Sequence, residues 1–421
     1  MLKTPAAERA RDSHASQPAV VAVMALGFGL VGFDRFLIST MFPTIARDLH
    51  LNYSDIGTIT GALAIAWGLS ALVTGNLSDH IGRRRVIVGA LLAFSLLIGA
   101  NGLATGLVGL VVVRVLMGLA DGAYTPTSIA ATLEASAPGR RGLNIGIQQM
   151  MLPLCGLGIA PILVAALLSV IDWRHIFLIF VAPGLALAVA AALVLPRAPP
   201  RAAAQVRRSG LGDWTAVLRV GNIRVAALMM LCWLTCLVTT SAFLPSYLID
   251  YLHLPFGAMS GVMAAIGLGS TVGTLALPWL SDRWGRKPVM HLGTACALIS
   301  LVALARSPAA VAPLFAALFS VHLFNNALIT LTVGPLCHES VPASLAATAS
   351  GLVIAVGELL GGGLAPAIVG HIAQRFGIEH VLIVPMAAMS VGLLLSFALH
   401  ETHFGGAAGG ALREHLGGVD E

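Results

Sequence analysis

Long apolar runs divide this sequence and leave room for little besides membrane-spanning helices. A helix needs about 20 mostly apolar residues to cross the hydrocarbon of a bilayer. Only 10% of the residues are charged, against about 25% in soluble proteins. We therefore predict an all-α membrane protein with twelve transmembrane helices, at residues 19–42, 54–76, 85–102, 106–131, 142–169, 175–195, 223–248, 257–280, 288–306, 309–335, 345–370 and 380–399.

The connections between these runs predict how the chain is oriented. Arginine and lysine gather in alternate loops on the side of the N-terminus, and cytoplasmic loops carry such an excess. The net charge of +5 therefore indicates orientation and does not indicate a nucleic-acid partner. Both termini are expected in the cytoplasm, and the location is expected to be a bacterial inner membrane.

The longest connection, residues 196–222, is rich in Pro, Ala and Arg and divides the spans six and six. We predict a disordered cytoplasmic leader at 1–18, an N-terminal half at 19–195, a cytoplasmic linker at 196–222, a C-terminal half at 223–400 and a disordered cytoplasmic tail at 401–421.

An internal repeat supports two pseudo-symmetric six-helix halves. The tripeptide Leu-His-Leu at 49–51 recurs at 252–254, and Leu-Ser-Asp at 77–79 recurs at 280–282. Both matches have the same offset of 203 residues, and a Gly followed by basic residues comes after each Leu-Ser-Asp. Parallel repeats of six spans place a substrate site between the halves, near the bilayer midplane.

Charged residues inside the apolar runs are the first site candidates. Asp34 and Arg35 lie together in span one, Arg114 and Asp121 share one face of span four, and Glu358 lies in span eleven. A charge at the bilayer centre costs about 2.5 to 3.5 kcal/mol on insertion scales and normally marks a functional pathway. Counting residues at 1.5 Å each places Arg114 at the depth of Asp34, so these two are expected to pair and leave Arg35 free. A purely structural ion pair is the alternative.

Glu358 is a candidate proton site, because a carboxyl group without a partner near the midplane is less costly to bury when protonated. Uncharged polar side chains inside the runs are candidate cavity residues or helix–helix contacts, since amides also join neighbouring membrane helices. They are Gln148, Gln149, His322, Asn325 and Asn326. The cysteines have no C-x-x-C spacing, so neither a metal site nor a catalytic site is predicted.

The loop at residues 75–85, GNLSDHIGRRR, strongly resembles the signature of the major facilitator superfamily, with a degenerate copy around Asp282. An acid at a helix end can pair with a neighbouring base or helix N-terminus, so the loop is interpreted as a gate latch. A simple positive-inside loop would explain only the basic residues. The gating candidates are Asp79, Gly82, Arg83, Asp282, Gly285 and Arg286.

Asp-Arg in span one, followed by Arg-x-x-x-Gly-x-x-acid in span four, is similar to the anion:cation symporter family. That resemblance implies transport of organic anions with protons. It implies Arg35 as the anchor for a substrate carboxylate, and Asp34 and Asp121 as proton carriers. Gln148, Gln149, Asn325 and Asn326 are the further substrate-binding candidates, and Arg114 and Glu358 join the proton-coupling set.

We therefore expect a secondary active transporter, not an enzyme, that imports a carboxylate-bearing organic anion with protons by alternating access. The five inward charges sum to minus one when all are ionised and to plus one when two acids are protonated, which would convert an anion-repelling site into an anion-binding one.

The alternative is a proton-coupled multidrug efflux antiporter, against which the two buried arginines argue. The expected partners are a small organic anion, protons and the bilayer, with no cofactor and no nucleic acid, for a monomer. Few hydroxyl or amide partners in the second half favour a less hydroxylated anion.

Overall fold

The computed structural model describes residues 5–196, 211–342 and 345–402, without the side chains of residues 5–16, 72–73, 75–80, 138, 211 and 213. Within these residues the chain is helical and contains no strand. Eleven described helical stretches are long and apolar enough to cross a membrane. Helix α2, with 29 residues, is about 43 Å long and is the twelfth.

The N-terminal half contains six spans that form one layer of the molecule. The spans are α1 (Pro5–Leu49), α2 (Tyr53–Ile81), α3 (Arg83–Asn101), α4 (Leu107–Ala135), the run α5–η2–α6 (Arg141–Pro153, Leu154–Ile159, Ala160–Leu168) and the run α7–α8 (Trp173–Ile179, Val181–Val194), with a short turn η1 (Pro138–Arg140) before α5.

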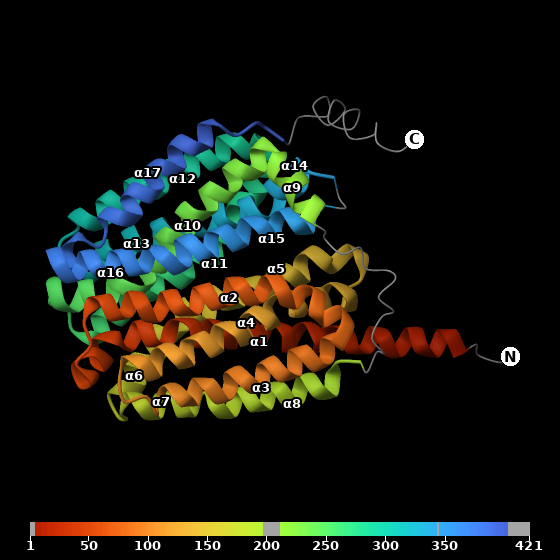
Figure 1. Ribbon diagram of the computed structural model, residues 1–421, viewed down its shortest axis with the longest axis horizontal. Helices are drawn as coiled ribbons and strands as arrows, with labels where there is room; N and C mark the ends of the chain where they lie inside the picture. Colours follow the sequence, from red (N-terminus) through yellow and green to blue (C-terminus); the bar gives the residue numbers. More distant parts are fainter. Residues whose placement is uncertain (1–4, 197–210, 343–344, 403–421) are drawn as a thin grey trace.

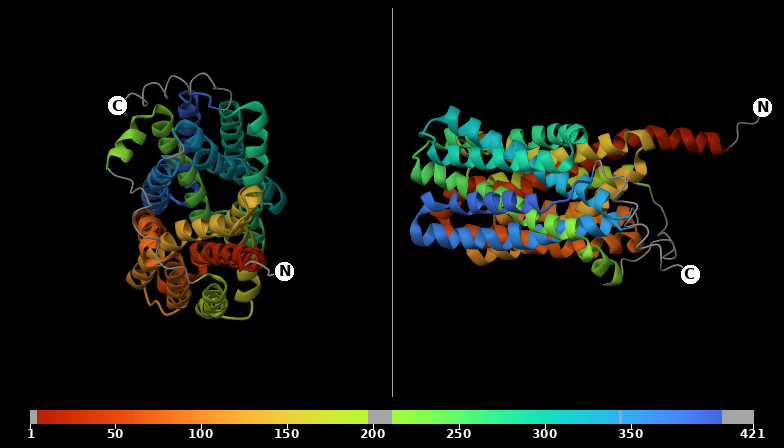
Figure 2. Two further views of the ribbon diagram at one scale, coloured as in Figure 1. Left: turned by 90° about the vertical axis from the view of Figure 1, so that its right-hand side faces the viewer. Right: turned by 90° about the horizontal axis from the view of Figure 1, so that it is seen from above.

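The C-terminal half repeats this order. Its spans are α10–η4 (Gly221–Ser246, Tyr247–Tyr251), α11 (Phe256–Trp284), α12 (Arg286–Arg306), α13–η5–α14 (Val311–Leu331, Thr332–Leu336, Cys337–Ser340), α15–η6–α16 (Ala346–Val356, Gly357–Leu364, Ala365–Phe376) and η7–α17 (Ile378–His380, Ile383–Phe397). Viewed along the bundle, the two halves lie on opposite sides of a central interface (Figure 2, left).

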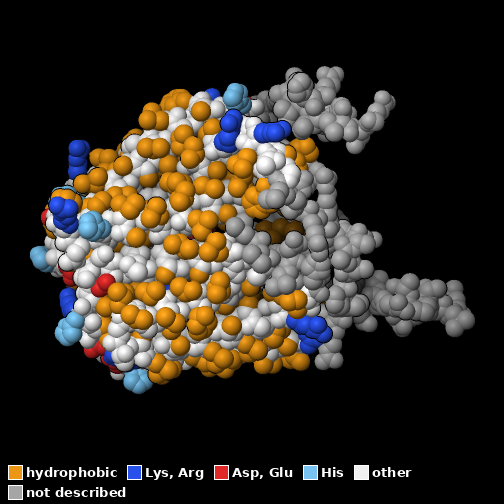
Figure 3. All heavy atoms as spheres, in the orientation of Figure 1, with side chains coloured by type: hydrophobic (Ala, Val, Ile, Leu, Met, Phe, Trp, Pro, Cys, Tyr) orange, Lys and Arg blue, Asp and Glu red, His pale blue; other side chains and the backbone are white. Residues whose placement is uncertain are grey.

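The expected twelve-helix fold in two halves is confirmed. Helix α1 begins and α17 ends toward the same end of the bundle, here called the terminus side; the opposite end is the far side (Figure 1). Hydrophobic side chains cover the middle of the face seen in Figure 3, and charged side chains lie toward its two ends. This distribution is that of a membrane-embedded surface.

The 203-residue repeat extends to the backbone. His50 and His253 both have φ of 53°, and Gly82 and Gly285 have φ of 96° and 93°. Helices α2 and α11 begin and end at equivalent positions, 53 and 256, then 81 and 284. Each glycine makes a left-handed turn that a residue with a Cβ adopts at a cost, which explains a Gly at this point in both halves.

Three segments differ from the expected organisation or lie partly outside the described residues. Helix α1 begins at Pro5, within the segment expected to be a disordered leader; extending an existing helix needs no new nucleation. The linker contains the short helix α9 (Leu211–Arg219), and its residues 197–210 are outside the description. The tail is described only to residue 402, where Glu401 accepts hydrogen bonds from the backbone N–H groups of Arg286 and Lys287.

Wide helical turns and glycines hold the halves together. The π-helical turns η2 and η6 lie at equivalent places in the repeat and pack against α11 and α2 of the opposite half. A Cβ on Gly267 would collide with the backbone of Gly158, and one on Gly61 would collide with the carbonyl of Gly363. These two crossings therefore bring the backbones of opposite halves into direct contact, on either side of α1 and α10.

Candidate functional site

A bidentate ion pair joins the two halves at the centre of the molecule. Arg35 of α1 donates from Nη1 and Nη2 to the two carboxylate oxygens of Glu358 on η6, at 3.2 and 2.8 Å. Both side chains are 9% exposed. The expectations that Arg35 is free and that Glu358 has no partner are therefore wrong, because the π-helical turn at Gly357–Leu364 aims Glu358 across the interface.

Aromatic rings hold the Arg35 guanidinium from the side. Its Cζ lies 4.4 Å from the ring centre of Trp67 and 5.8 Å from that of Phe36. A cation over the face of an aromatic ring is attracted by the ring's quadrupole, more strongly where water is excluded. The guanidinium is thus oriented by α1 and α2, independently of the carboxylate that it binds.

Arg114 contacts Asp34 at a different atom from the one expected. Its Nη1 donates to the backbone carbonyl oxygen of Asp34 at 2.8 Å, and its Nε and Nη2 have no protein partner. Both carboxylate oxygens of Asp34 also lack a hydrogen-bond donor. Arg114 and Asp34 lie at the same depth, as predicted. The predicted ion pair between Arg114 and the Asp34 carboxylate is wrong, because Arg114 donates to the backbone carbonyl instead.

Asp34 and Asp121 form a buried pair of acids. Asp34 is 1% exposed and Asp121 is fully buried. The two acids lie close enough for their charges to act on each other and on Arg114, and none of their four carboxylate oxygens has a hydrogen-bond partner among the described residues. Two carboxylates cannot hydrogen-bond to each other unless one of them carries a proton. The arrangement can therefore store a proton between α1 and α4.

The predicted amide candidates mostly bond to neighbouring helices. Gln148 accepts from Thr132 at 2.6 Å and donates to Ser128 at 2.9 Å, both on α4. Asn325 donates to the carbonyl of Trp233 on α10 at 3.2 Å.

Asn326 donates to Thr274 at 2.7 Å and to the carbonyl of Ser270, both on α11. His322 lies 3.1 Å from the Thr240 hydroxyl and Gln149 is exposed. In this conformation the amides of Gln148, Asn325 and Asn326 serve contacts within each half.

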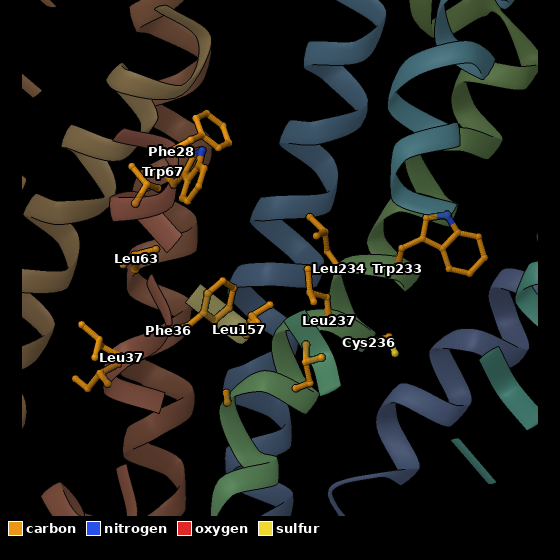
Figure 4. Packing of buried hydrophobic residues seen from close by; sticks show 14 of the residues in the cluster. Phe28, Phe36, Leu37, Leu63, Trp67, Leu157, Trp233, Leu234, Cys236 and Leu237 are labelled. Carbon is orange, nitrogen blue, oxygen red and sulfur yellow. The ribbon is translucent and has the colours of Figure 1, made fainter. Parts of the chain in front are cut away.

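A small cavity lies beside the central ion pair. Its volume is about 10 Å³, room for about one water molecule. Arg35 and Arg114 contribute to its wall from the N-terminal half, and residues of α10 close it from the C-terminal half. Phe36 and Leu157 extend toward Leu234 and Leu237 of α10 (Figure 4). The cavity is thus enclosed by side chains of both halves.

On the far side, polar contacts between the halves involve residues that the sequence analysis did not single out. The Tyr53 hydroxyl donates to Asp250 at 3.0 Å, and the Tyr53 backbone N–H donates to Gln374 at 3.2 Å. Arg47 lies 3.8 Å from Asp250. In the sequence, Tyr53 and Asp250 lie beside the repeated Leu-His-Leu turns, and this position could have identified them as candidates.

The gating candidates form ion pairs within each half on the terminus side. Arg83 pairs with Glu134 at 2.7 Å, and its repeat equivalent Arg286 pairs with Glu339 at 2.7 Å and with Asp282 at 2.6 Å. Gly82 and Gly285 make the left-handed turns before these arginines. The side chain of Asp79 lies outside the description. Each motif therefore ties the start of one helix to the end of another.

Three relatives among known proteins align with different shares of this chain. A tetracenomycin C resistance and export protein from Streptomyces glaucescens is 29% identical over 42% of this chain, which spans only 33% of that protein's length. The 3-(3-hydroxy-phenyl)propionate transporter of Escherichia coli K12 is 28% identical over 75% of this chain and 77% of its own. The sialic acid transporter NanX of the same organism is 26% identical over 88% and 91%.

The fold and the family agree. A bacterial homologue of the human lysosomal transporter Spinster, crystallised in an inward-facing and unoccupied conformation, superimposes with a TM-score of 0.77 at 16% identity, over 91% of this chain and 97% of that one. The family model described as Major Facilitator Superfamily matches residues 24–366. The chain therefore belongs to the major facilitator superfamily of membrane transporters.

Proposed function

We propose that this protein imports a small carboxylate-bearing organic anion together with protons by alternating access. The proposal rests on the two hydrogen bonds that the Arg35 guanidinium donates to the Glu358 carboxylate at the centre of the molecule. The planar guanidinium matches carboxylate geometry, and Trp67 orients it from the side. A substrate carboxylate would bind Arg35 in the place that Glu358 occupies here.

Competition for Arg35 couples the anion to a proton. While Glu358 is ionised it occupies the guanidinium and its charge repels a second carboxylate. Protonation removes that charge, weakens the pair and frees Arg35 for the substrate. Arg35 faces Glu358 from α1, whereas Met230 and Leu234 of α10 and Ala64 of α2 surround this turn with apolar groups. No second basic side chain of the described residues forms an ion pair with Glu358.

The acid pair provides a second place for a proton. Asp34 and Asp121 lie side by side in the N-terminal half, next to Arg114 and without other hydrogen-bond donors on their carboxylate oxygens. Asp34 precedes Arg35 in the chain, so a change in its charge reaches the substrate anchor directly. We assign proton coupling to Asp34, Asp121 and Glu358, with Arg114 positioning the first two.

The contacts on the far side define the conformation that the proposal starts from. With the terminus side taken as cytoplasmic, the bonds of Tyr53 to Asp250 and Gln374 close the external end. The Arg83–Glu134 and Arg286–Glu339 ion pairs each join two helices of the same half, so rocking of the halves leaves these two pairs intact. We therefore infer that Tyr53 and Asp250 act as an external gate that opens when the halves rock.

The relatives support an organic anion as substrate, since phenylpropionate and sialic acid both carry a carboxylate. The Streptomyces relative is named for export, so the competing candidate is a proton-coupled antiporter. The two are distinguished by direction: under a gradient that is acidic outside, a symporter raises the internal concentration of its substrate and an antiporter lowers it.

The test is uptake into proteoliposomes of the full-length protein with the outside more acidic than the inside, using labelled 3-phenylpropionate and gluconate. Protein-free liposomes measure the passive entry of the neutral acid. The expected result is accumulation of at least one acid above this level, abolished by a protonophore and by Arg35→Ala. Depletion below the protein-free level, or accumulation that survives Arg35→Ala, would overturn the proposal.

A further inference from the structure

We propose that the substrate is a monocarboxylate with an apolar body, of the arylalkanoate class, and not a polyhydroxylated or a dicarboxylic acid. This inference rests on the proposed function, because it describes what Arg35 would hold. It comes from the walls of the cavity beside Arg35, from the hydrogen bonds already made by the polar groups in those walls, and from the number of cations that face it.

Apolar side chains from both halves dominate the walls. Phe36 and Leu63 contribute from α1 and α2, at 4% and 2% exposure, and Val238 and Ala242 contribute from α10, at 5% and 1%. Removing such a surface from water is favourable only when it meets an apolar partner. A ligand whose carboxylate binds Arg35 would lay the rest of its body against these four side chains.

Three hydroxyl groups lie in the walls: those of Thr60 and Ser241 are already committed, and that of Ser39 makes no hydrogen bond with the described residues. Thr60 donates to the backbone carbonyl of Ile56 at 2.7 Å, and Ser241 donates to that of Leu237 at 2.6 Å, each within its own helix. The nearby amides are likewise used in contacts within each half. A sugar acid enclosed here would leave several hydroxyl groups without partners, and a site that cannot pair such groups discriminates against them.

The charges of the cavity suit one anionic group. Arg35 becomes available when Glu358 takes up a proton. Arg114, the other cation of the wall, lies beside the carboxyl groups of Asp34 and Asp121 and donates to the Asp34 carbonyl. A second carboxylate on the ligand would approach two acids together with that one cation. The site therefore matches a ligand with a single negative charge.

The volume of the cavity indicates at which step the ligand enters. With Glu358 bound to Arg35, its volume of about 10 Å³ holds no more than about one water molecule. An arylalkanoate fits only after Glu358 withdraws and α10 moves away from α1. Binding and separation of the central pair are thus the same event, and the apolar walls of α10 close on the ligand afterward.

The experiment measures affinities of the purified full-length protein for 3-phenylpropionate, gluconate and succinate at about pH 5.5. The inference expects 3-phenylpropionate to bind about tenfold more tightly than either other acid, in the range that apolar contacts distinguish. Tighter binding of gluconate or succinate, lost in Arg35→Ala, would overturn this inference and leave the proposed function standing. Failure of all three acids to bind would overturn both.

A matched pair of variants tests the walls themselves. Val238→Thr replaces one methyl group in the cavity by a hydroxyl, and Val189→Thr makes the same change at a position 58% exposed on α8. The expected result is a severalfold weaker affinity of Val238→Thr for 3-phenylpropionate and an unchanged affinity of Val189→Thr. Equal affinities in the two variants would contradict the assignment of α10 to the substrate body. The comparison of the three acids on the unchanged protein does not depend on either variant folding.

Discussion

Arg35 and Glu358 lie 323 residues apart in the chain and meet in a two-pronged ion pair, with Nη2 of Arg35 2.8 Å from Oε2 of Glu358. The pair joins α1 of the N-terminal half to η6 of the C-terminal half. Removing one partner of a buried pair costs about 3–5 kcal/mol, because an unpaired charge is left behind. In the proposed mechanism, the pair separates in each transport cycle, and a proton or a substrate anion replaces the lost contact.

Replacement of Arg35 by lysine tests whether bidentate geometry matters. Arg35→Lys keeps the charge but offers a point charge in place of the planar fork, so we expect about a tenfold or greater loss of uptake rate. The measurement is initial uptake into proteoliposomes at equal protein content. Arg306→Lys, at the exposed end of α12, is the control and should transport normally. Normal uptake by Arg35→Lys would show that only charge is required.

Asp121→Asn separates coupling from binding. The amide cannot release a proton, so we expect exchange of labelled for unlabelled substrate to continue while accumulation driven by a pH gradient falls to the level of the external solution. Both quantities are measured in one batch of proteoliposomes. Asp55→Asn, at the start of α2 and away from the charged centre, should keep both activities. Undiminished gradient-driven accumulation in Asp121→Asn would exclude this residue from coupling.

Two glycines of α11 provide a matched test of the contact between the halves. A Cβ on Gly267 would strike the backbone of Gly158 and Leu157, whereas one on Gly261 would meet nothing within 4 Å. We expect Gly267→Ala to destabilise the protein by about 1–3 kcal/mol and to reduce transport, because overpacking displaces η2. Gly261→Ala should be neutral or stabilising by up to about 1 kcal/mol. Unfolding in detergent measures both, and equal stability would argue against direct backbone contact at this crossing.

Tyr53→Phe tests the external gate. The change removes the hydroxyl that donates to Asp250 and keeps the ring, and one such hydrogen bond contributes about 0.5–1.5 kcal/mol. We expect faster hydrogen–deuterium exchange in η4 and at the start of α2, since the far side opens more often. Tyr251→Phe is the control; its ring is tilted by 42° against that of Tyr247, with the centroids 5.2 Å apart. Unchanged exchange in Tyr53→Phe would show that this bond does not hold the gate.

The sequence predicted the twelve helices and the repeat because both depend on local patterns. Apolar length determines a span, and the 203-residue offset reappears in the backbone as paired left-handed residues, His50 with His253 and Gly82 with Gly285. Equal rise per residue along helices also placed Arg114 correctly at the depth of Asp34.

The partners of the charged residues could not be predicted in this way. The pairing of Arg35 with Glu358 depends on how far the π-helical turn η6 rotates its side chains and on the glycines that set the spacing between the halves. Helical counting carries no information about which atom of Asp34 faces Arg114. For Asn326 and Gln148, the neighbours that accept or donate come from helices whose rotation the sequence leaves open.

The most direct test of the central claim is the affinity of Glu358→Gln for 3-phenylpropionate at about pH 5.5 and about pH 7.5, beside the unchanged protein and Glu379→Gln, an exposed control on η7. The glutamine keeps the shape of the protonated acid and has no charge to compete for Arg35. We predict that the unchanged protein and Glu379→Gln bind about tenfold more tightly at the lower pH, and that Glu358→Gln binds with that higher affinity at both values. A Glu358→Gln variant that retains the full pH dependence would contradict the claim that protonation of Glu358 releases Arg35.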